Sequence, residues 1–363
     1  MQTPDLRVDE LRIRPWHLDD ADAMVRACQD PVRHRWSPEL PWPYGREHAE
    51  GFIREHDGLH LAVFDEHDLV GSVALHSINE DAGTAEIGYW SAPWARGRRV
   101  TERAGRALLR WAFEEGLARI DWKARIGNHA SRLTALRLGF TIIGTRPGDK
   151  KCPAQWVGAL TETGLTPPGT DVASSVRRTA RAFYAGHPVL EAGPVTLRKP
   201  EEKDILSVTQ AFNDPEVVRW FAPPQPYHES HGRRYVTVRV NEWWDSGAEA
   251  VFAIVDHLDA YTGSIDLRVS DNDPAVGEVG YFVAPWARGR GYAVAATRAI
   301  SRWGFEELGL QRIELRWEAG NELSGKVAAG AGFTTEGSLR QALKINGTRR
   351  DCWVASRLRE EAV

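Results

Sequence analysis

The segment Arg288–Ala293 contains residue types that can bind a phosphorylated ligand. It reads Arg-Gly-Arg-Gly-Tyr-Ala and joins an expected strand to an expected helix. Glycines allow several backbone N–H groups to converge on an anion, and a helix N-terminus adds a partial positive charge. We therefore predict a pyrophosphate site here. The segment fits neither the dinucleotide-binding Gly-x-Gly-x-x-Gly unit nor the Gly-Lys-Ser/Thr phosphate loop.

This loop lies in a long internal repeat. Residues Glu86–Arg98 and Glu278–Arg290 are identical at ten of thirteen positions, and the two segments lie 192 positions apart. Further matches follow in the same order, namely Trp111–Glu115 with Trp303–Glu307, Gly127–Ser131 with Gly320–Ser324 and Leu138–Phe140 with Ala331–Phe333. So long a period excludes a solenoid and indicates a duplicated domain. We predict an N-terminal domain over 1–160, a linker over 161–192 and a C-terminal domain over 193–363.

Each copy predicts strands and helices in the same order. Alternating or apolar runs such as 251–255 and 263–267 predict strands, and the Arg-Gly-Arg turn leads into a helix near Trp303. This mixture indicates an α+β domain around a mixed sheet. In the linker, 171–185 predicts a short basic helix capped by Asp171. That helix either packs across both domains or is an ordered spacer.

Composition narrows the functional class. The chain has 363 residues, 42% of them hydrophobic, and a net charge of −4, which argues against a general nucleic-acid binder. No signal pattern or bilayer-length apolar run is present. The odd number of widely spaced cysteines argues against a disulfide framework and favours the cytoplasm. The pairs His56/His60 and His228/His231 lack a third ligand, so we expect solvated histidines and no metal.

Several ordered motifs resemble one enzyme family. The pattern Arg288-x-x-Gly291-x-Ala293 is similar to the pyrophosphate loop of the GNAT superfamily of N-acetyltransferases. Glu278–Tyr281 before the loop and Asn321-x-x-Ser324 after it resemble the ribosomal-protein-alanine N-acetyltransferase subgroup. The resemblance covers nearly all of the second copy and most of the first. It implies two tandem domains, each with a mostly antiparallel mixed sheet, flanking helices and a splayed central strand pair.

The resemblance also implies how acetyl-CoA binds as a co-substrate. Its pantetheine arm would lie between strands ending near Val283 and Trp317 and pair with the backbone of Phe282 and Val283. Its pyrophosphate would lie on the loop and the first turn of the following helix. The implied binding residues are Phe282, Val283, Arg288, Gly289, Arg290, Gly291, Tyr292, Ala293, Val294 and Asn321.

Three residues are candidates for the chemistry, which is direct attack of a primary amine on the thioester. Ser324 and Asn321 match family positions that face the pantetheine and the departing sulfur; they also fit an Asn-x-x-Ser helix cap. Glu278 is the first candidate for positioning the amine or its deprotonating water, with a purely structural carboxylate as the alternative. An α-amine with a pKa of ~8 needs little base, so positioning supplies most of the rate.

The two copies differ in the loop itself. Arg99 stands where the second copy has Gly291, and Thr101 stands in place of Ala293. A bulky residue disfavours positive φ and crowds the phosphate surface, whereas added arginine charge favours a polyanion. We predict that the first copy is degenerate in acetyl-CoA binding and that the second copy carries the chemistry.

Aromatic residues early in the second copy predict an acceptor cleft, because rings stack on flat groups and hold cationic amines. These residues are Trp220, Phe221, Tyr227, Trp243 and Trp244. Core filling is the alternative for each ring. The predicted acceptor is a small amine-bearing metabolite or antibiotic, and a protein N-terminal α-amine is the alternative. A non-catalytic acyl-CoA sensor is the alternative of another class. We expect a monomer or homodimer without nucleic-acid or membrane partners.

Overall fold

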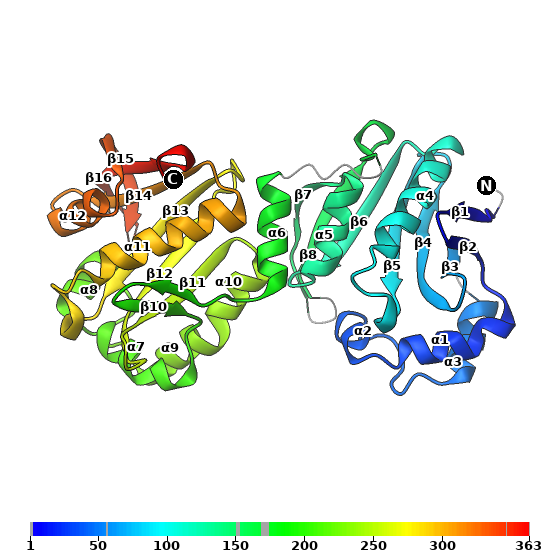
Figure 1. The fold of residues 1–363 in the computed structure, drawn as a ribbon, viewed down its shortest axis with the longest axis horizontal. Helices are drawn as coiled ribbons and strands as arrows, with labels where there is room; N and C mark the ends of the chain where they lie inside the picture. Colours follow the sequence, from blue (N-terminus) through cyan, green and yellow to red (C-terminus); the bar gives the residue numbers. More distant parts are fainter. Residues whose placement is uncertain (1–2, 56, 150–152, 168–173, 346, 363) are drawn as a thin grey trace. The chain divides into compact units, whose positions relative to one another are not determined.

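A computed structural model describes residues 3–55, 57–149, 153–167, 174–345 and 347–362. The chain divides into two compact units, Met1–Val172 and Ala173–Val363 (Figure 1). No helix in the described part of the chain is long and apolar enough to cross a bilayer.

The N-terminal unit contains an eight-stranded sheet in the order β1-β2-β3-β4-β5-β6-β8-β7. Among the described residues of this unit, β5 and β6 pair in parallel and the other strand pairs are antiparallel. The strands are β1 Leu6–Val8, β2 Leu11–Pro15, β3 Leu59–Phe64, β4 Leu69–Asn79, β5 Thr84–Ser91, β6 Arg119–Arg125, β7 Thr141–Arg146 and β8 Gln155–Leu160. The α-helices are α1 Ala21–Cys28, α2 Pro31–Trp36, α3 Arg46–Arg54, α4 Val100–Glu114 and α5 His129–Leu138.

The C-terminal unit repeats this plan in the order β15-β16-β14-β13-β12-β11-β10-β9, and β13 and β14 form its parallel pair. Its strands are β9 Leu190–Ala192, β10 Val195–Arg198, β11 Glu249–Val255, β12 Tyr261–Val269, β13 Val276–Val283, β14 Arg312–Glu318, β15 Thr334–Ile345 and β16 Thr348–Leu358. Its helices are α6 Ser175–Ala185, α7 Ile205–Ala211, α8 Pro215–Phe221, α9 Glu229–Arg234, α10 Val240–Ser246, α11 Tyr292–Trp303 and α12 Glu322–Gly330, with a π-helical turn η5 over Tyr235–Arg239.

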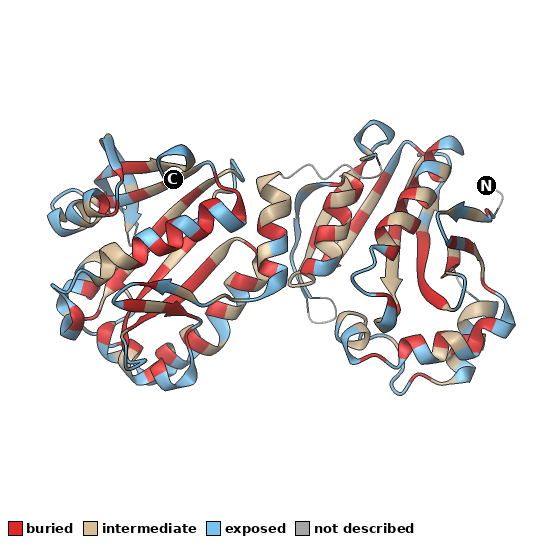
Figure 2. Ribbon diagram, in the orientation of Figure 1, coloured by how far each residue is buried: buried red, intermediate tan, exposed pale blue. Residues whose placement is uncertain are grey.

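The C-terminal sheet is covered on both faces, as Figure 2 shows by the buried residues along its central strands. Val279 of β13 packs in one core with Ala296, Ile300 and Trp303 of α11. Their spacing of three or four residues places these side chains on one stripe of that helix. Phe282 packs in a second core with residues of α7, α8 and η5. The sheet therefore has an α11 face and an α7–η5 face.

The described part of the predicted linker contains helix α6, which packs on the C-terminal unit. Ser175 donates to the carbonyl of Gly309 at 2.8 Å, and Phe183 lies in the core with Trp244. Ser174 caps the helix by accepting the N–H of Arg177. The expected cap, Asp171, lies outside the described residues.

The predicted fold class is confirmed for both copies. Each unit has a mixed, mostly antiparallel sheet, flanking helices and one parallel central pair. The pair splays in each case, because the residue pairing stops at Val279/Leu315 and at Ile87/Trp122 although all four strands continue.

Candidate active site

The splay leaves one edge of β13 without a strand partner. From Gly280 to Val283, β13 pairs with β12 on one side, and β14 has already diverged on the other. The Phe282 ring is buried in the α7–η5 core, so its backbone rather than its side chain lies at this edge. An extended ligand with amide groups can hydrogen-bond to such an edge as an added strand does.

The loop after β13 has the backbone expected of an anion site. Gly289 and Gly291 have φ values of +77° and +74°, and a Cβ at either would meet nothing within 4 Å. No acceptor in the described ranges receives the N–H groups of Gly289, Arg290 or Gly291. Helix α11 starts at Tyr292, and the first N–H groups of a helix have no intrahelical acceptor. The N–H groups of the loop and those of the first turn of α11 are therefore both available to bind one anion.

The two arginines of this loop differ. Arg288 donates to the carboxylate of Asp214, which caps α8, and to the carbonyl of Val283 at 3.3 Å. Arg288 therefore holds the loop in place. Arg290 is exposed and forms no hydrogen bond or ion pair within the described chain. It is the cation left for a ligand.

Asn321 and Ser324 lie at the start of α12. Asn321 Oδ1 accepts the N–H of Ser324 at 3.3 Å, so the predicted helix cap is present. Ser324 also lies beside the buried hydroxyl of Tyr281. Burial raises the pKa of Tyr281 to about 12, and the nearby Ser324 opposes that shift.

The equivalent serine of the first copy is already engaged. Ser131 Oγ accepts the indole N–H of Trp122 at 3.2 Å, and Tyr89 donates to the Ser131 carbonyl at 2.9 Å. Trp122 corresponds to Leu315, which has no donor, by the register of β6 and β14. The hydroxyl of Ser324 therefore lacks the indole donor that its counterpart has.

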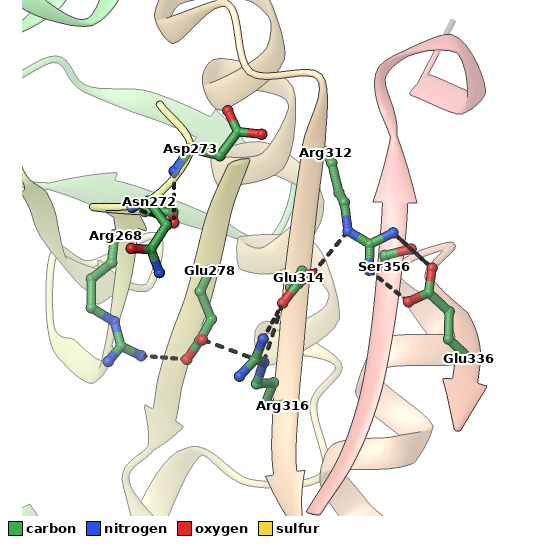
Figure 3. Close-up of polar contacts among 10 residues, drawn as sticks. Arg268, Asn272, Asp273, Glu278, Arg312, Glu314, Arg316, Glu336 and Ser356 are labelled. Carbon is green, nitrogen blue, oxygen red and sulfur yellow. Dashed lines mark hydrogen bonds and ion pairs between the residues drawn. The ribbon is translucent and has the colours of Figure 1, made fainter. Parts of the chain in front are cut away.

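Glu278 is fixed by arginines on the two neighbouring strands. Its carboxylate lies 3.2 Å from Arg268 on β12 and 3.7 Å from Arg316 on β14 (Figure 3). Arg316 also pairs with Glu314 at 2.7 Å. In the first copy the equivalent Glu86 pairs with Lys123. The carboxylate is thus held beside the start of the splay.

Two further carboxylates, which the sequence analysis missed, lie on neighbouring strands. Burial raises the pKa of Asp266 to about 6 and that of Glu249 to about 7. The charge of Glu278 adds to the shift of Asp266, and Arg268 opposes it. Their relation to Glu278 depends on the cross-strand register of β11, β12 and β13, which no local motif encodes.

The five predicted aromatic residues do not form one wall. Trp244 is a core residue, because it is buried against Phe183 and donates its indole N–H to the Phe183 carbonyl at 3.1 Å. Tyr227 is buried and stacks on Phe212.

The other three predicted rings are more accessible. Phe221 is 47% exposed and lies 5.6 Å from the Phe282 ring. Trp243 is half-buried against Tyr235, with ring centroids 6.0 Å apart. Trp220 lies on α8 under the guanidinium of Arg219.

The loop of the first copy keeps its shape in spite of its substitutions. Gly97 has a φ of +78° and Arg99 a φ of +54°, close to their glycine counterparts. Arg99 therefore adopts the left-handed conformation that arginine disfavours, and the loop is not reshaped. Arg98 is bound by Asp65 at 2.8 Å. Glu102, a buried carboxylate in the first turn of α4, lies 3.9 Å from Arg99.

His228 and His231 interact locally at the start of α9. His231 Nδ1 accepts the backbone N–H of His228 at 3.0 Å, which explains their spacing at the start of α9. His56 lies outside the described residues. Within those that are described, no three His, Cys, Asp or Glu side chains group as metal ligands would.

Comparison with known proteins defines the class. Residues 10–141 and 195–334 both match the family model described as the acetyltransferase (GNAT) domain. The chain therefore belongs to the GNAT acetyltransferase family, with two tandem domains.

Individual relatives match about half of the chain. YdaF of Bacillus subtilis, provisionally named a ribosomal N-acetyltransferase, is 36% identical over 172 residues, which are 46% of this chain and 92% of YdaF. The uncharacterized N-acetyltransferase p20 of Bacillus licheniformis is 30% identical over 168 residues, 46% of this chain and 94% of p20. The structure of Mycobacterium smegmatis RimJ in complex with a CoA disulfide is 25% identical, with a TM-score of 0.41, covering 48% of this chain and 88% of RimJ.

Proposed function

We propose that the C-terminal unit binds acetyl-CoA and transfers the acetyl group to a primary amine. The observation that carries this proposal is the open edge of β13 from Gly280 onward, followed directly by a loop of unpaired N–H groups at the start of α11. The open strand edge can pair with the amide groups of pantetheine, and the adjacent loop N–H groups can bind the pyrophosphate at the other end of the same ligand.

Each part of the site has a distinct task in the proposed reaction. The pyrophosphate binds the N–H groups of Gly289–Val294 and the side chain of Arg290, while Arg288 holds the loop. The pantetheine pairs with the backbone of Phe282 and Val283. The amine attacks the thioester carbonyl, and the leaving thiolate faces the hydroxyl of Ser324. A thiol with a pKa of ~8.5 leaves with one hydrogen bond rather than a strong acid.

The proposed acceptor is a small amine-bearing molecule with an apolar or ring-bearing body. The carboxylates of Glu278 and Asp266 attract a cationic amine to the α7–η5 face of the sheet. The half-buried Trp243 beside Tyr235 and the exposed Phe221 offer rings to the rest of the molecule.

A second acceptor class is the N-terminal α-amine of a protein. YdaF carries a ribosomal N-acetyltransferase name, and it is 36% identical to this chain over 172 residues. An α-amine is also about a tenth neutral at pH 7, so it reacts more readily than a lysine-type amine.

The experiment measures acetyl-CoA binding by calorimetry, followed by thiol release over a panel of amines. The panel contains tryptamine, phenylalaninamide, and short peptides that begin with Ser or Ala. We expect binding together with thiol release that depends on one class of amine. Binding without thiol release for any amine identifies an acyl-CoA sensor, and absence of binding contradicts the proposal altogether.

A further inference from the structure

Asp266 lies directly over the point at which the central strands separate. On β12 it is opposite Gly280 of β13, the first residue beyond the last pair, Val279/Leu315. A Cβ at Gly280 would lie 2.8 Å from Asp266 Oδ1 and 3.0 Å from Oδ2. The missing side chain of Gly280 therefore leaves the space that the carboxylate occupies.

The Asp266 side chain is largely enclosed. About a quarter of the Asp266 side chain, 23%, is exposed. Arg268 Nε lies 3.1 Å from Oδ2, and Oδ2 is itself buried. Glu278, by contrast, lies between two arginines. Asp266 thus has one arginine as a neighbour, and Glu278 has two.

The charged and titratable groups around Asp266 come from every neighbouring element. Arg268 shares its strand, Glu278 faces it from β13 and Glu249 from β11, and Tyr235 of η5 is within electrostatic reach. Burial and the charge of Glu278 outweigh Arg268, and the pKa of Asp266 rises to about 6.

The first copy places a different titratable group over the equivalent glycine. Gly88 of β5 corresponds to Gly280, and a Cβ there would lie 2.6 Å from His76 Nε2. Ala74 stands opposite Gly88, in the place of Asp266. Both copies thus combine a glycine at the splay with a proton-accepting side chain from the adjacent strand, although the residue and its position differ.

The geometry points to Asp266 as the group that takes the proton from the attacking amine, a role that rests on the proposed acetyl transfer. The bound ammonium gives one proton to Asp266, and the neutral amine forms the C–N bond at the thioester carbon. The C–S bond breaks, and the second amine proton passes to the thiolate, with Ser324 as its hydrogen-bond donor. Asp266 returns its proton to solvent, which leaves an amide, free CoA thiol and one released proton.

The acid–base balance favours this carboxylate over an ordinary one. Transfer from an α-amine of pKa ~8 to a carboxylate of pKa about 6 is uphill by roughly a hundredfold. Transfer to an ordinary aspartate of pKa ~3.9 is uphill by roughly ten-thousandfold. A general base works best when its pKa approaches the operating pH, so the burial of Asp266 directly assists the step.

The test compares Asp266→Asn with the wild-type full chain, using acetyl-CoA and the best α-amine of the panel. We expect the variant to bind acetyl-CoA normally and to lose about tenfold in kcat/KM at pH 7, because only about a tenth of an α-amine is neutral at that pH. The loss should shrink to less than about threefold at pH 9.5, where solvent has already deprotonated the amine. The wild-type profile of kcat/KM against pH should have a limb near pH 6, and this limb should be absent from the profile of Asp266→Asn. A loss of kcat/KM caused by a structural defect would not be reversed by raising the pH.

Two variants complete the design. Glu249→Gln removes one carboxylate from the same face without touching Gly280, and it should change kcat/KM by less than about threefold. Gly280→Ala displaces the Asp266 carboxylate and should reproduce the deficit at pH 7. If the wild type acetylates an amine but Asp266→Asn retains its rate and pH profile, this inference alone is overturned. If the wild type acetylates none, the proposed function fails as well.

Discussion

The loop Arg288–Tyr292 and its counterpart Arg96–Val100 have one backbone and two different electrostatic environments. Their glycine-type positions have φ values of +77° and +74° in the second copy and +78° and +54° in the first. An arginine in the left-handed region costs roughly 1–2 kcal/mol. The first unit tolerates this strain and keeps the loop, so the backbone alone does not distinguish the copies.

Charge placement distinguishes them instead. In the first copy Glu102 puts a buried carboxylate into the first turn of α4, where the second copy has Val294. A carboxylate at a helix N-terminus takes the favourable position that a phosphate would occupy. Arg98 is bound by Asp65, whereas Arg290 has no partner in the described parts of the chain. From this difference we expect the first copy to bind a pyrophosphate less tightly than the second, although its loop geometry is the same.

Converting the second loop into the first is the most damaging change. Gly291→Arg copies Arg99, and because Arg99 retains the loop conformation, its side chain acts by covering the phosphate surface. Losing two or three charge-assisted hydrogen bonds of roughly 1.5–3 kcal/mol each weakens acetyl-CoA binding by at least about 10²-fold. Calorimetry checks the loss, and urea unfolding should show a stability cost of only about 1 kcal/mol. Normal binding by this variant would refute the pyrophosphate assignment.

The Asp266 carboxylate beside Gly280 predicts that the stability of the chain depends on pH. The pKa of Asp266 is about 6 in the folded chain, above its value of ~3.9 when unfolded. The folded state therefore binds the proton more tightly, and the wild type loses on the order of 2 kcal/mol relative to Asp266→Asn as the pH rises from 4 to 7. Urea unfolding of the wild type and of Asp266→Asn between pH 4 and 7 measures this difference in the free energy of unfolding. A stability difference independent of pH would contradict the raised pKa.

The two serines give a matched pair of variants. Ser324→Ala should lower turnover about tenfold, the equivalent of one hydrogen bond, with acetyl-CoA affinity unchanged. Ser131→Ala should leave turnover unaltered, because the Ser131 hydroxyl is engaged by Trp122. Steady-state kinetics on both variants tests this. Equal losses would show that both copies work, and no loss from Ser324→Ala would leave that serine as part of a helix cap.

Repair of the first loop is the subtlest change. In the Gly291→Arg background, combining Arg99→Gly, Thr101→Ala and Glu102→Val removes the charge and bulk that distinguish the first copy. We expect acetyl-CoA affinity to rise about tenfold over the background, since only part of the second site is rebuilt. Calorimetry provides the readout. An unchanged affinity would show that residues outside the loop close the first site.

The sequence predicts the duplication and the α+β class through motif order and local periodicity, whereas the splayed pair was implied by the resemblance to the GNAT family. The sequence analysis did not identify Glu102, because the effect of its carboxylate on anion binding depends on its place in the first turn of α4. It did not identify Asp266, because Asp266 lies opposite Gly280 through the cross-strand register, which no sequence motif encodes. Trp244 was assigned to the acceptor cleft, yet it packs under Phe183 of α6, a contact between residues 61 positions apart.

The number of acetyl-CoA molecules bound per chain tests the central claim most directly. Titration of the wild-type chain by calorimetry should give one tight site, and Gly291→Arg should remove it. Two equivalent sites in the wild type, or a tight site that survives Gly291→Arg, would contradict the assignment of acetyl-CoA binding to the second copy.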